Sequence, residues 1–386
     1  MDEDQATVRF VDRLIADAVE HRASDIHLQP EQDTLRIRLR IDGLLREAQG
    51  PPAALRSRAI ARLKLLAGMD VAEQRLPQDG RLQGQDSTGQ PVQFRVASCP
   101  SVHGEKLVLR LIERDAPATI EALAMPDPAR EALETALDRT EGLILVTGPT
   151  GSGKTATLHA ALHRLNTPER NICAVEDPVE MEVPGVTQVA VNRRAGVDFA
   201  RALRAFLRQD PDVILIGEIR DAETAAIAVK AAQTGHLVLS TLHTRSAAGA
   251  VERLAQMGVP GYDLASSLSL VVAQRLVRRR CPACRAADGA EAAPGTAAGT
   301  ADGRTPGCPH CRDGYSGRRG VFQVMPLTAG IAEAVLAGAS ARQLEARARE
   351  AGVPDLHTAG WPLVEAGETS AAELRRVTRE AEPWPA

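Results

Sequence analysis

An octet near the middle of the chain constrains the fold more than any other feature. Residues 148–155 read Gly-Pro-Thr-Gly-Ser-Gly-Lys-Thr and directly follow the apolar run 142–147. Such an octet between a strand and a helix is typical of a phosphate-binding loop, because glycines let successive backbone N–H groups turn toward phosphates. The helix predicted over 156–165 adds the positive end of its dipole. The alternative interpretation is a glycine-rich surface turn.

The octet also assigns roles to single side chains. Lys154 is expected to reach the β- and γ-phosphates of a nucleotide, and the Thr155 hydroxyl is expected to hold Mg²⁺. The residues predicted to bind the nucleotide are Gly148, Pro149, Thr150, Gly151, Ser152, Gly153, Lys154, Thr155 and Ala156.

Composition argues against several other classes of protein. The chain has 386 residues, enough for two or three domains, and its formal net charge of −4 creates no field that would recruit nucleic acid. Aromatic residues make up only 2% of it, so stacking platforms for single strands are not expected. No run reaches the roughly 18 apolar residues of a membrane span, and the acidic start is unlike a secretory signal. These features predict a cytoplasmic protein that meets a membrane only through partners.

Periodicity predicts a first α/β domain over residues 1–113. Residues 35–41 alternate apolar residues with arginine, which is typical of a half-buried strand, and the turn 42–43 ends it. Three prolines then mark residues 114–129 as a linker. The other elements predicted in this domain are helices over 4–21 and 53–67 and strands over 92–97 and 106–112.

Short apolar runs separated by helical stretches predict a mostly parallel sheet in a core over residues 130–280. The rest divides into a tetracysteine module over 281–320 and a helical region over 321–386. Residues 285–307, rich in Ala, Gly and Thr, predict a mobile loop. The predicted core strands are 142–147, 172–175, 186–191, 213–217 and 237–241, and the predicted C-terminal helices are 330–352 and 371–380.

Two acidic residues follow predicted core strands. Glu218 ends the run 212–218, where a second strand of a P-loop enzyme brings a carboxylate beside Mg²⁺ and the γ-phosphate. It is expected either to order the metal's water shell or to polarise the attacking water; the alternative is an ordinary strand-end acid. Glu176 lies in the acidic stretch 175–180, where a metal-proximal role competes with a solvated acidic turn.

A histidine and a row of arginines follow in the same region. His243 directly follows the run 237–242 and could donate a hydrogen bond to the γ-phosphate, although a strand-end histidine is more often structural. Asp198 is expected to cap a helix that ends before Pro211. Arg204 and Arg208 lie on one face of that helix with Arg201, where they either stabilise phosphoryl charge or form a solvated stripe.

Four of the six cysteines form two Cys-x-x-Cys pairs, Cys281 with Cys284 and Cys308 with Cys311. Two such knuckles separated by a loop fit tetrahedral Zn²⁺, and four thiolates leave no open position, so the predicted site is structural. Redox pairs are the rival interpretation, and His310 could replace one thiolate.

Together these residues resemble one family, the secretion-superfamily ATPases of type II secretion systems and type IV pilus assembly, the GspE/PilB class. The resemblance covers nearly the whole chain. Besides the octet and the cysteines, the segments that carry it are Ser24-Asp-Ile-His27, Arg38-Leu-Arg-Ile-Asp-Gly43, Leu76-Pro-Gln-Asp-Gly-Arg81, His103-Gly-Glu-Lys106, Val175-Glu-Asp-Pro-Val-Glu180, Leu207-Arg-Gln-Asp-Pro-Asp212, Gly217-Glu-Ile-Arg-Asp221, Thr234-Gly-His-Leu-Val-Leu-Ser-Thr-Leu-His-Thr244 and Gly314-Tyr-Ser-Gly-Arg-Arg-Gly320.

The resemblance implies a fold and an assembly. The fold is α/β, with an N-terminal PAS-like domain, a RecA-like P-loop core, a zinc-binding tetracysteine insertion and a helical C-terminus. The assembly is a hexameric ring that binds ATP between the N-terminal domain and the core. In this scheme Arg204 and Arg208 match a pair of nucleotide-reaching arginines of the core, Arg38 or Arg40 matches an N-terminal one, and His243 matches the histidine box. The cysteine module argues against the pilus-retraction branch.

The expected function is ATP hydrolysis by a motor that drives pseudopilus assembly in type II secretion. Its expected partners are platform and recruiting proteins of the inner membrane, and no nucleic acid. Type IV pilus or competence pilus assembly is the alternative, and a RecA-like nucleic-acid motor or a non-enzymatic nucleotide-binding regulator are rivals.

Two departures from the family pattern stand out. Arg245 stands where the family commonly has asparagine, which affects the geometry expected of the histidine box. The chain also begins at the family's second domain, so a natural short form or a truncated protein is expected.

Overall fold

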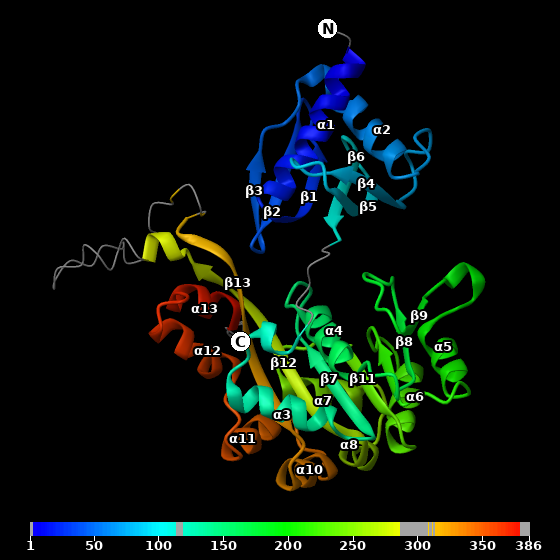
Figure 1. Ribbon diagram of the computed structural model, residues 1–386, viewed down its shortest axis with the longest axis vertical. Helices are drawn as coiled ribbons and strands as arrows, with labels where there is room; N and C mark the ends of the chain where they lie inside the picture. The colour runs from blue at the N-terminus through cyan, green and yellow to red at the C-terminus, as the bar shows by residue number, and fades with distance from the viewer. Residues whose placement is uncertain (1–2, 113–118, 286–307, 309–310, 312, 379–386) are drawn as a thin grey trace, which may run out of the picture. The chain divides into compact units, whose positions relative to one another are not determined.

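The computed structural model describes residues 3–112, 119–285, 308, 311 and 313–378, and the chain divides into two compact units, residues 1–114 and 115–386 (Figure 1). Each unit is built around its own sheet. Among the described helices, none is both long enough and apolar enough to cross a bilayer.

The first unit is a six-stranded antiparallel sheet with the strand order β3-β2-β1-β6-β5-β4. Helices α1 and α2 pack together on one face of it (Figure 1). The apolar residues of the alternating strand β2 face this core, and its arginines face away. The elements are α1 (Glu3–Glu20), β1 (Ala23–Pro30), β2 (Leu35–Ile41), β3 (Leu44–Ala48), η1 (Ala53–Leu55), α2 (Arg56–Leu66), β4 (Gln78–Gln85), β5 (Pro91–Ser101) and β6 (Gly104–Leu111).

Three strands of this unit were not predicted from the sequence. β1 buries Ile26 and Leu28 between polar residues, β3 is a short edge strand, and β4 contains glycine and buries only Leu82. The strand conformation of β3 and β4 comes from pairing with neighbours rather than from hydrophobic alternation, whereas β1 alternates only over Ile26-His27-Leu28.

The second unit contains a seven-stranded sheet with the order β13-β12-β7-β11-β10-β8-β9. Every neighbouring pair is parallel except β12 with β13. Alternate residues of β7 enter two different cores: Leu143 and Leu145 face the side of α5 to α8, while Ile144 and Val146 face α3 and α4. Burial on both faces explains why the central strands are continuous apolar runs.

The strands of the second unit are β7 (Gly142–Thr147), β8 (Ile172–Glu176), β9 (Val186–Ala190), β10 (Val213–Ile216), β11 (Leu237–Leu242), β12 (Leu268–Arg280) and β13 (Tyr315–Pro326). Its helices are η2 (Glu121–Leu123), α3 (Asp127–Leu137), α4 (Lys154–Leu165), η3 (Arg193–Ala195), α5 (Phe199–Phe206), α6 (Ala222–Gln233), α7 (Ala247–Gln256), α8 (Gly261–Ser267), α10 (Ala329–Leu336), α11 (Ala341–Glu350), α12 (Leu356–Glu365) and α13 (Ala371–Thr378).

The structure confirms the predicted α/β class but divides the chain differently in two places. Residues 119–129, predicted as linker, belong to the second unit, because Ile120, Leu123 and Met125 are buried in its core. β13 crosses the boundary predicted at residue 320, because its apolar residues pair along β12, a strand that was not predicted.

The C-terminal region is helical as predicted, with two differences. The helix predicted over 330–352 is two helices, and the left-handed Gly338 lies between them. α12, which contains Pro362, was not predicted. The part of the predicted loop beyond residue 285, His310, and the last two residues of the helix predicted over 371–380 lie outside the described residues.

Candidate functional site

The carboxyl ends of four neighbouring parallel strands bring the candidate residues together. β7 lies beside β11, β11 beside β10, and β10 beside β8. The phosphate-loop octet follows β7, His243 follows β11, Glu218 follows β10 after one intervening residue, and Glu176 ends β8. In parallel α/β sheets ligands bind at this edge.

The octet forms a tight loop between β7 and α4. Gly148 has φ 156° and Gly153 has φ 88°, both in the region that favours glycine. A Cβ at Gly148 would lie 2.6 Å from the backbone oxygen of Gln274. A Cβ at Gly153 would lie 2.7 Å from the side-chain nitrogen Nε2 of the same residue. The loop therefore needs glycine at both ends, since β12 packs directly against it.

Two atoms inside the loop suit a phosphate ligand. The Ser152 hydroxyl is buried and has no hydrogen-bond partner among the described residues. Lys154 is only 9% exposed, and its Nζ donates to the backbone oxygens of Gly148 (2.8 Å) and Pro149 (3.1 Å). Burial lowers the Lys154 pKa to about 8, with Glu218 opposing this shift and Arg275 adding to it. Phosphate oxygens would give this ammonium a charged partner in place of two carbonyls.

Glu218 is held as a carboxylate between two basic side chains. Arg220 donates to its Oε1, and His243 Nε2 lies 3.4 Å from its Oε2. Burial raises the Glu218 pKa, but the hydrogen bonds and charges of Arg220 and His243 outweigh burial, so the net shift is downward. The structure thus brings the predicted Glu218 and His243 into contact, and it adds Arg220, which the sequence analysis had not singled out.

Glu176 faces the protein interior. Its Oε1 accepts from Gln188 (2.8 Å), and its Oε2 lies 3.7 Å from His159 Nε2 on α4. The neighbouring Asp177 points instead to Arg220 (3.5 Å) and Arg193 (3.8 Å). The acidic stretch is therefore divided between an inward and an outward carboxylate. His159 was missed, although its place five residues after Lys154 on a buried helix could have drawn attention to it.

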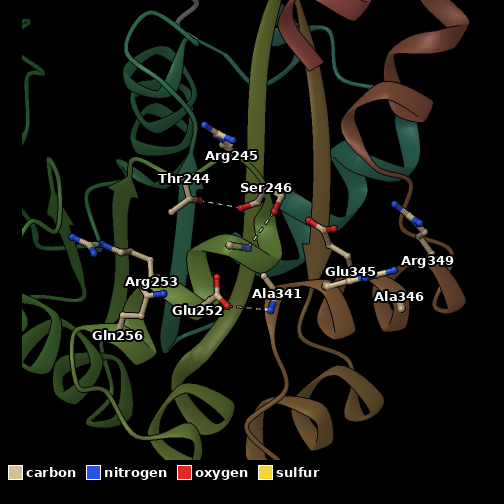
Figure 2. Close-up of a pocket in the computed structure, with 12 residues that line it drawn as sticks. Thr244, Arg245, Ser246, Glu252, Arg253, Gln256, Ala341, Glu345, Ala346 and Arg349 are labelled. Carbon is tan, nitrogen blue, oxygen red and sulfur yellow. Dashed lines mark hydrogen bonds between the residues drawn. The ribbon is translucent and has the colours of Figure 1, made fainter. Parts of the chain in front are cut away.

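Hydrogen bonds join the loop strand to the segment after β11. Thr147 Oγ1 lies 2.7 Å from Thr244 Oγ1 and accepts from the Thr244 backbone N–H (2.9 Å). Figure 2 shows Thr244 bonded in turn to the Ser246 backbone. The residue after His243 is therefore fixed to the strand that precedes the phosphate loop.

A pocket of about 890 Å³ opens beyond Ser246, between α7 and α11 (Figure 2). Figure 2 shows Arg245, Arg253 and Arg349 spread apart around it, with Glu252 and Glu345 between them. None of residues 148–155 lines it. It is therefore a hollow beside the strand-end site, as we call the phosphate loop together with His243, Glu218 and Glu176, and not part of it.

The predicted arginine face is only partly formed. Asp198 caps α5 as predicted, accepting from the Arg201 backbone (2.8 Å), but α5 ends at Phe206 and leaves Arg208 beyond it. Arg204 pairs with Glu223, and Arg208 donates to the Arg204 backbone oxygen (2.7 Å). Both arginines are exposed, and no bond in the described residues joins either to the phosphate loop, Glu218 or Glu176.

The four cysteines lie close together beside the end of β12 and the start of β13. Their sulfur atoms all lie within 4.8 Å of one another, with Cys281 and Cys308 at 3.7 Å and Cys284 and Cys311 at 3.5 Å. Four Zn–S bonds of about 2.3 Å at tetrahedral angles would separate the sulfurs by roughly 3.8 Å. The described geometry therefore fits the predicted zinc site.

Known proteins with a similar sequence include secretion and pilus ATPases. The family model described as "Type II/IV secretion system protein" matches residues 1–376. The chain is 45% identical to the type IV pilus assembly ATPase PilB of Pseudomonas aeruginosa, over 98% of this chain and 68% of that protein. It is also 45% identical to the type II secretion system protein E of Dickeya dadantii, over 98% of this chain and 77% of that protein.

A solved structure shares the fold. The ATPase DotB of Legionella pneumophila superposes with a TM-score of 0.69 at 22% identity, covering 95% of both chains. At this identity the likeness concerns the fold alone.

Proposed function

The chain belongs to the type II/IV secretion system protein family, an ATPase family that serves secretion and pilus systems, and we propose that it is a hexameric motor that hydrolyses ATP to drive pseudopilus assembly in type II protein secretion. Type IV pilus or competence pilus assembly is the second candidate, because a pilus ATPase and a secretion ATPase match this chain at the same identity. The observation that supports the ATPase assignment most strongly is that the phosphate loop, Glu218 and His243 lie together at the carboxyl ends of neighbouring parallel strands.

The loop residues supply binding. Backbone N–H groups of residues 150–156, the Ser152 hydroxyl and the Lys154 ammonium would hold the phosphates of ATP, with Pro149, which has no N–H, shaping the loop. Thr155 would hold Mg²⁺, which supplies charge neutralisation at the β- and γ-phosphates when bound. Lys154 would exchange its two carbonyl partners for phosphate oxygens, which compensates the charge that burial disfavours.

The strand-end side chains supply the chemistry. Glu218, held ionised by Arg220 and His243, would accept a hydrogen bond from the attacking water and orient it. His243 would sense the γ-phosphate, and Thr244 would pass its position to β7 through Thr147. Glu176 would act close to the metal from the next strand, in contact with His159.

Other groups would act between protomers. Arg204 and Arg208 are exposed and lack bonds to the described site, so we propose that they reach a nucleotide across the ring, together with Arg38 or Arg40 of a first unit. The partners would be platform and recruiting proteins at the inner membrane, with the motor on the cytoplasmic side. The tetracysteine site would hold structural Zn²⁺.

The test of the ATPase is the variant Lys154→Ala in the full chain, with Lys230→Ala as the matched control, because Lys230 is an exposed lysine of α6. We expect the control to hydrolyse ATP like the parent and Lys154→Ala to lose nucleotide binding and phosphate release. Equal binding and hydrolysis in Lys154→Ala would refute the proposal. Stimulation of the parent by DNA would favour the rival nucleic-acid motor.

The test of the pathway uses the source organism. Replacing the native gene with its Lys154→Ala form should abolish secretion of folded proteins and leave surface pili intact. Loss of pili or of DNA uptake with secretion unchanged would assign the chain to pilus or competence assembly instead.

A further inference from the structure

Arg275 is a buried arginine whose partners are all backbone carbonyls. It lies on β12, is 9% exposed, and donates from Nη1 to Gln274 (2.9 Å), from Nη2 to Arg245 (2.7 Å) and from Nε to Val377 (3.2 Å). Among the described residues no carboxylate forms an ion pair with it, and the charge that acts on it is that of Arg245. A guanidinium is planar and carries five donors in a fixed fork, so it can hold three separate segments in one arrangement.

The first segment held by Arg275 is its own strand beside the phosphate loop. The preceding residue, Gln274, accepts from Thr157 Oγ1 (2.7 Å) through its side chain. The backbone oxygen of Gln274 lies against Gly148, and its side-chain nitrogen Nε2 lies against Gly153. A shift of β12 at Gln274 would therefore displace both ends of the phosphate loop.

The second segment is the one that carries His243. Arg275 fixes the backbone oxygen of Arg245, two residues after His243, and Thr244 between them is bonded to Thr147 on β7. His243 Nε2 lies 3.4 Å from Glu218. The position of His243 against the candidate catalytic carboxylate thus depends on a segment with two anchors, Thr147 and Arg275.

The third segment is the last turn of α13. The final carbonyls of a helix have no partner within it and form the negative end of its dipole, so Val377 is suited to a cation. α13 itself is fixed to β12 by the buried Glu373, which accepts from Arg278 Nη2 (3.0 Å) and from the Arg278 backbone N–H (3.0 Å). The docking of α13 therefore determines where Arg275 finds its third acceptor.

We propose that Arg275 is a positioning residue that couples the docking of the C-terminal helix α13 to the geometry of the strand-end site. When α13 is docked, the guanidinium holds the segment 243–245 in place; when α13 shifts, Arg275 loses the Val377 carbonyl and the segment is free to move. Any partner that pulls on α13 would then change turnover without touching the nucleotide. This inference rests on the proposed ATPase function.

The first experiment compares Arg275→Lys with Arg279→Lys in the full chain. Arg279 is an exposed arginine of the same strand and serves as the matched control. Lysine keeps the charge but cannot span three carbonyls, so Arg275→Lys should lower kcat about tenfold with KM for ATP changed by less than about twofold, as small misplacements of reacting groups do. The control should match the parent in both constants.

The second experiment tests the coupling to α13. Glu373→Gln should lower kcat several-fold in the parent and add little in the Arg275→Lys background, because both changes release the same segment. Glu365→Gln, on the exposed side of α12, is the control and should leave kcat unchanged. If Arg275→Lys does not fold, Glu373→Gln alone decides the matter.

The outcomes separate this inference from the proposed function. A Lys154→Ala protein that still hydrolyses ATP would overturn the function itself. An inactive Lys154→Ala protein together with parental kcat in Arg275→Lys would overturn only the positioning role. Multiplicative effects of Glu373→Gln and Arg275→Lys, or a lower melting temperature with kcat unchanged, would also overturn the coupling.

Discussion

The two sheets of this protein use charged residues in different ways. In the antiparallel sheet of the first unit, ion pairs such as Arg36 with Glu47 and Arg40 with Asp25 join neighbouring strands and are spread along the sheet. In the parallel sheet of the second unit, strands far apart in sequence end at one edge, so Glu218 and His243 meet beside the phosphate loop. Parallel geometry concentrates polar groups at one edge, and antiparallel geometry distributes them.

The β12–β13 hairpin is an exception inside the second unit. It is antiparallel, and the ends of its strands lead into the four cysteines rather than into the strand-end site. A closed set of four thiolates has no open position for a reactant. In this unit the antiparallel pair thus leads to the predicted zinc site and not to the strand-end site.

The largest expected effect concerns this exception. We predict about one zinc per chain, because structural zinc in cysteine sites binds with an apparent free energy of about 10–16 kcal/mol. Elemental analysis should find the metal in the parent and in Cys99→Ser, whose cysteine is exposed and outside the cluster, and should find it lost in Cys308→Ser/Cys311→Ser. Metal-free protein with a melting temperature insensitive to chelator would contradict the assignment.

The second prediction tests whether charge in the first unit serves stability. Lys64 is fully buried, and its Nζ lies 2.7 Å from Glu105 Oε1 and 2.7 Å from the Glu73 backbone oxygen. Lys64→Met leaves the Glu105 carboxylate unpaired and should lower the free energy of unfolding by about 3–5 kcal/mol, as removing one partner of a buried pair does. Urea unfolding measures this loss.

The control for this prediction is an exposed ion pair of the same unit. Arg58 lies 2.7 Å from Glu3 and 2.9 Å from Asp4 at the surface. Arg58→Met should cost less than about 1 kcal/mol. Equal losses in the two variants would show that burial does not set the energy of charge pairs in this unit.

The third prediction tests whether charge at the parallel edge serves chemistry. Glu218→Gln keeps the shape of the side chain but removes the charge that orients water, so turnover should fall at least about 100-fold while ATP binding persists. Phosphate release and nucleotide affinity are measured together, with the exposed Glu169→Gln as control. Near-parental phosphate release in Glu218→Gln would place the catalytic carboxylate elsewhere.

The fourth and smallest prediction concerns acid sensitivity. Burial raises the Glu373 pKa, but hydrogen bonds from Arg376 and Arg278 outweigh this and lower it to about 2. A lowered pKa stabilises the folded state above the ordinary value of 4.5, and this contribution is lost as pH falls from 4.5 toward 2. Its size should be roughly 1.5–3 kcal/mol, typical of hydrogen bonds to charged groups.

The measurement for Glu373 is chemical unfolding at several pH values. The parent should be more stable than Glu373→Gln above pH 4.5, and the difference should shrink as the solution approaches pH 2. A difference in stability that stays constant over this range would show that the carboxylate does not titrate with a lowered pKa.

Much of the core and of the candidate site could be predicted because their signals are local. The octet, the apolar central strands and the Cys-x-x-Cys pairs are each contained in a few consecutive residues, and the structure contains all of them. The polar strand β4 could not be predicted this way, nor could the full length of β12, although its apolar run 268–273 is a local signal that was missed. Their conformation depends on strands that pair with them from elsewhere in the chain.

By itself, the sequence determined that a phosphate loop stands between a strand and a helix, which acids and histidine follow the neighbouring strands, and which cysteines can share a metal. The order of strands in the sheet decided that Glu218 contacts His243 and that Glu176 turns inward to His159. It also decided that Arg275 joins three segments separated by up to 132 residues, Arg245 to Val377. Short-range patterns encode backbone conformation, whereas contacts between distant segments exist only once the sheet has assembled.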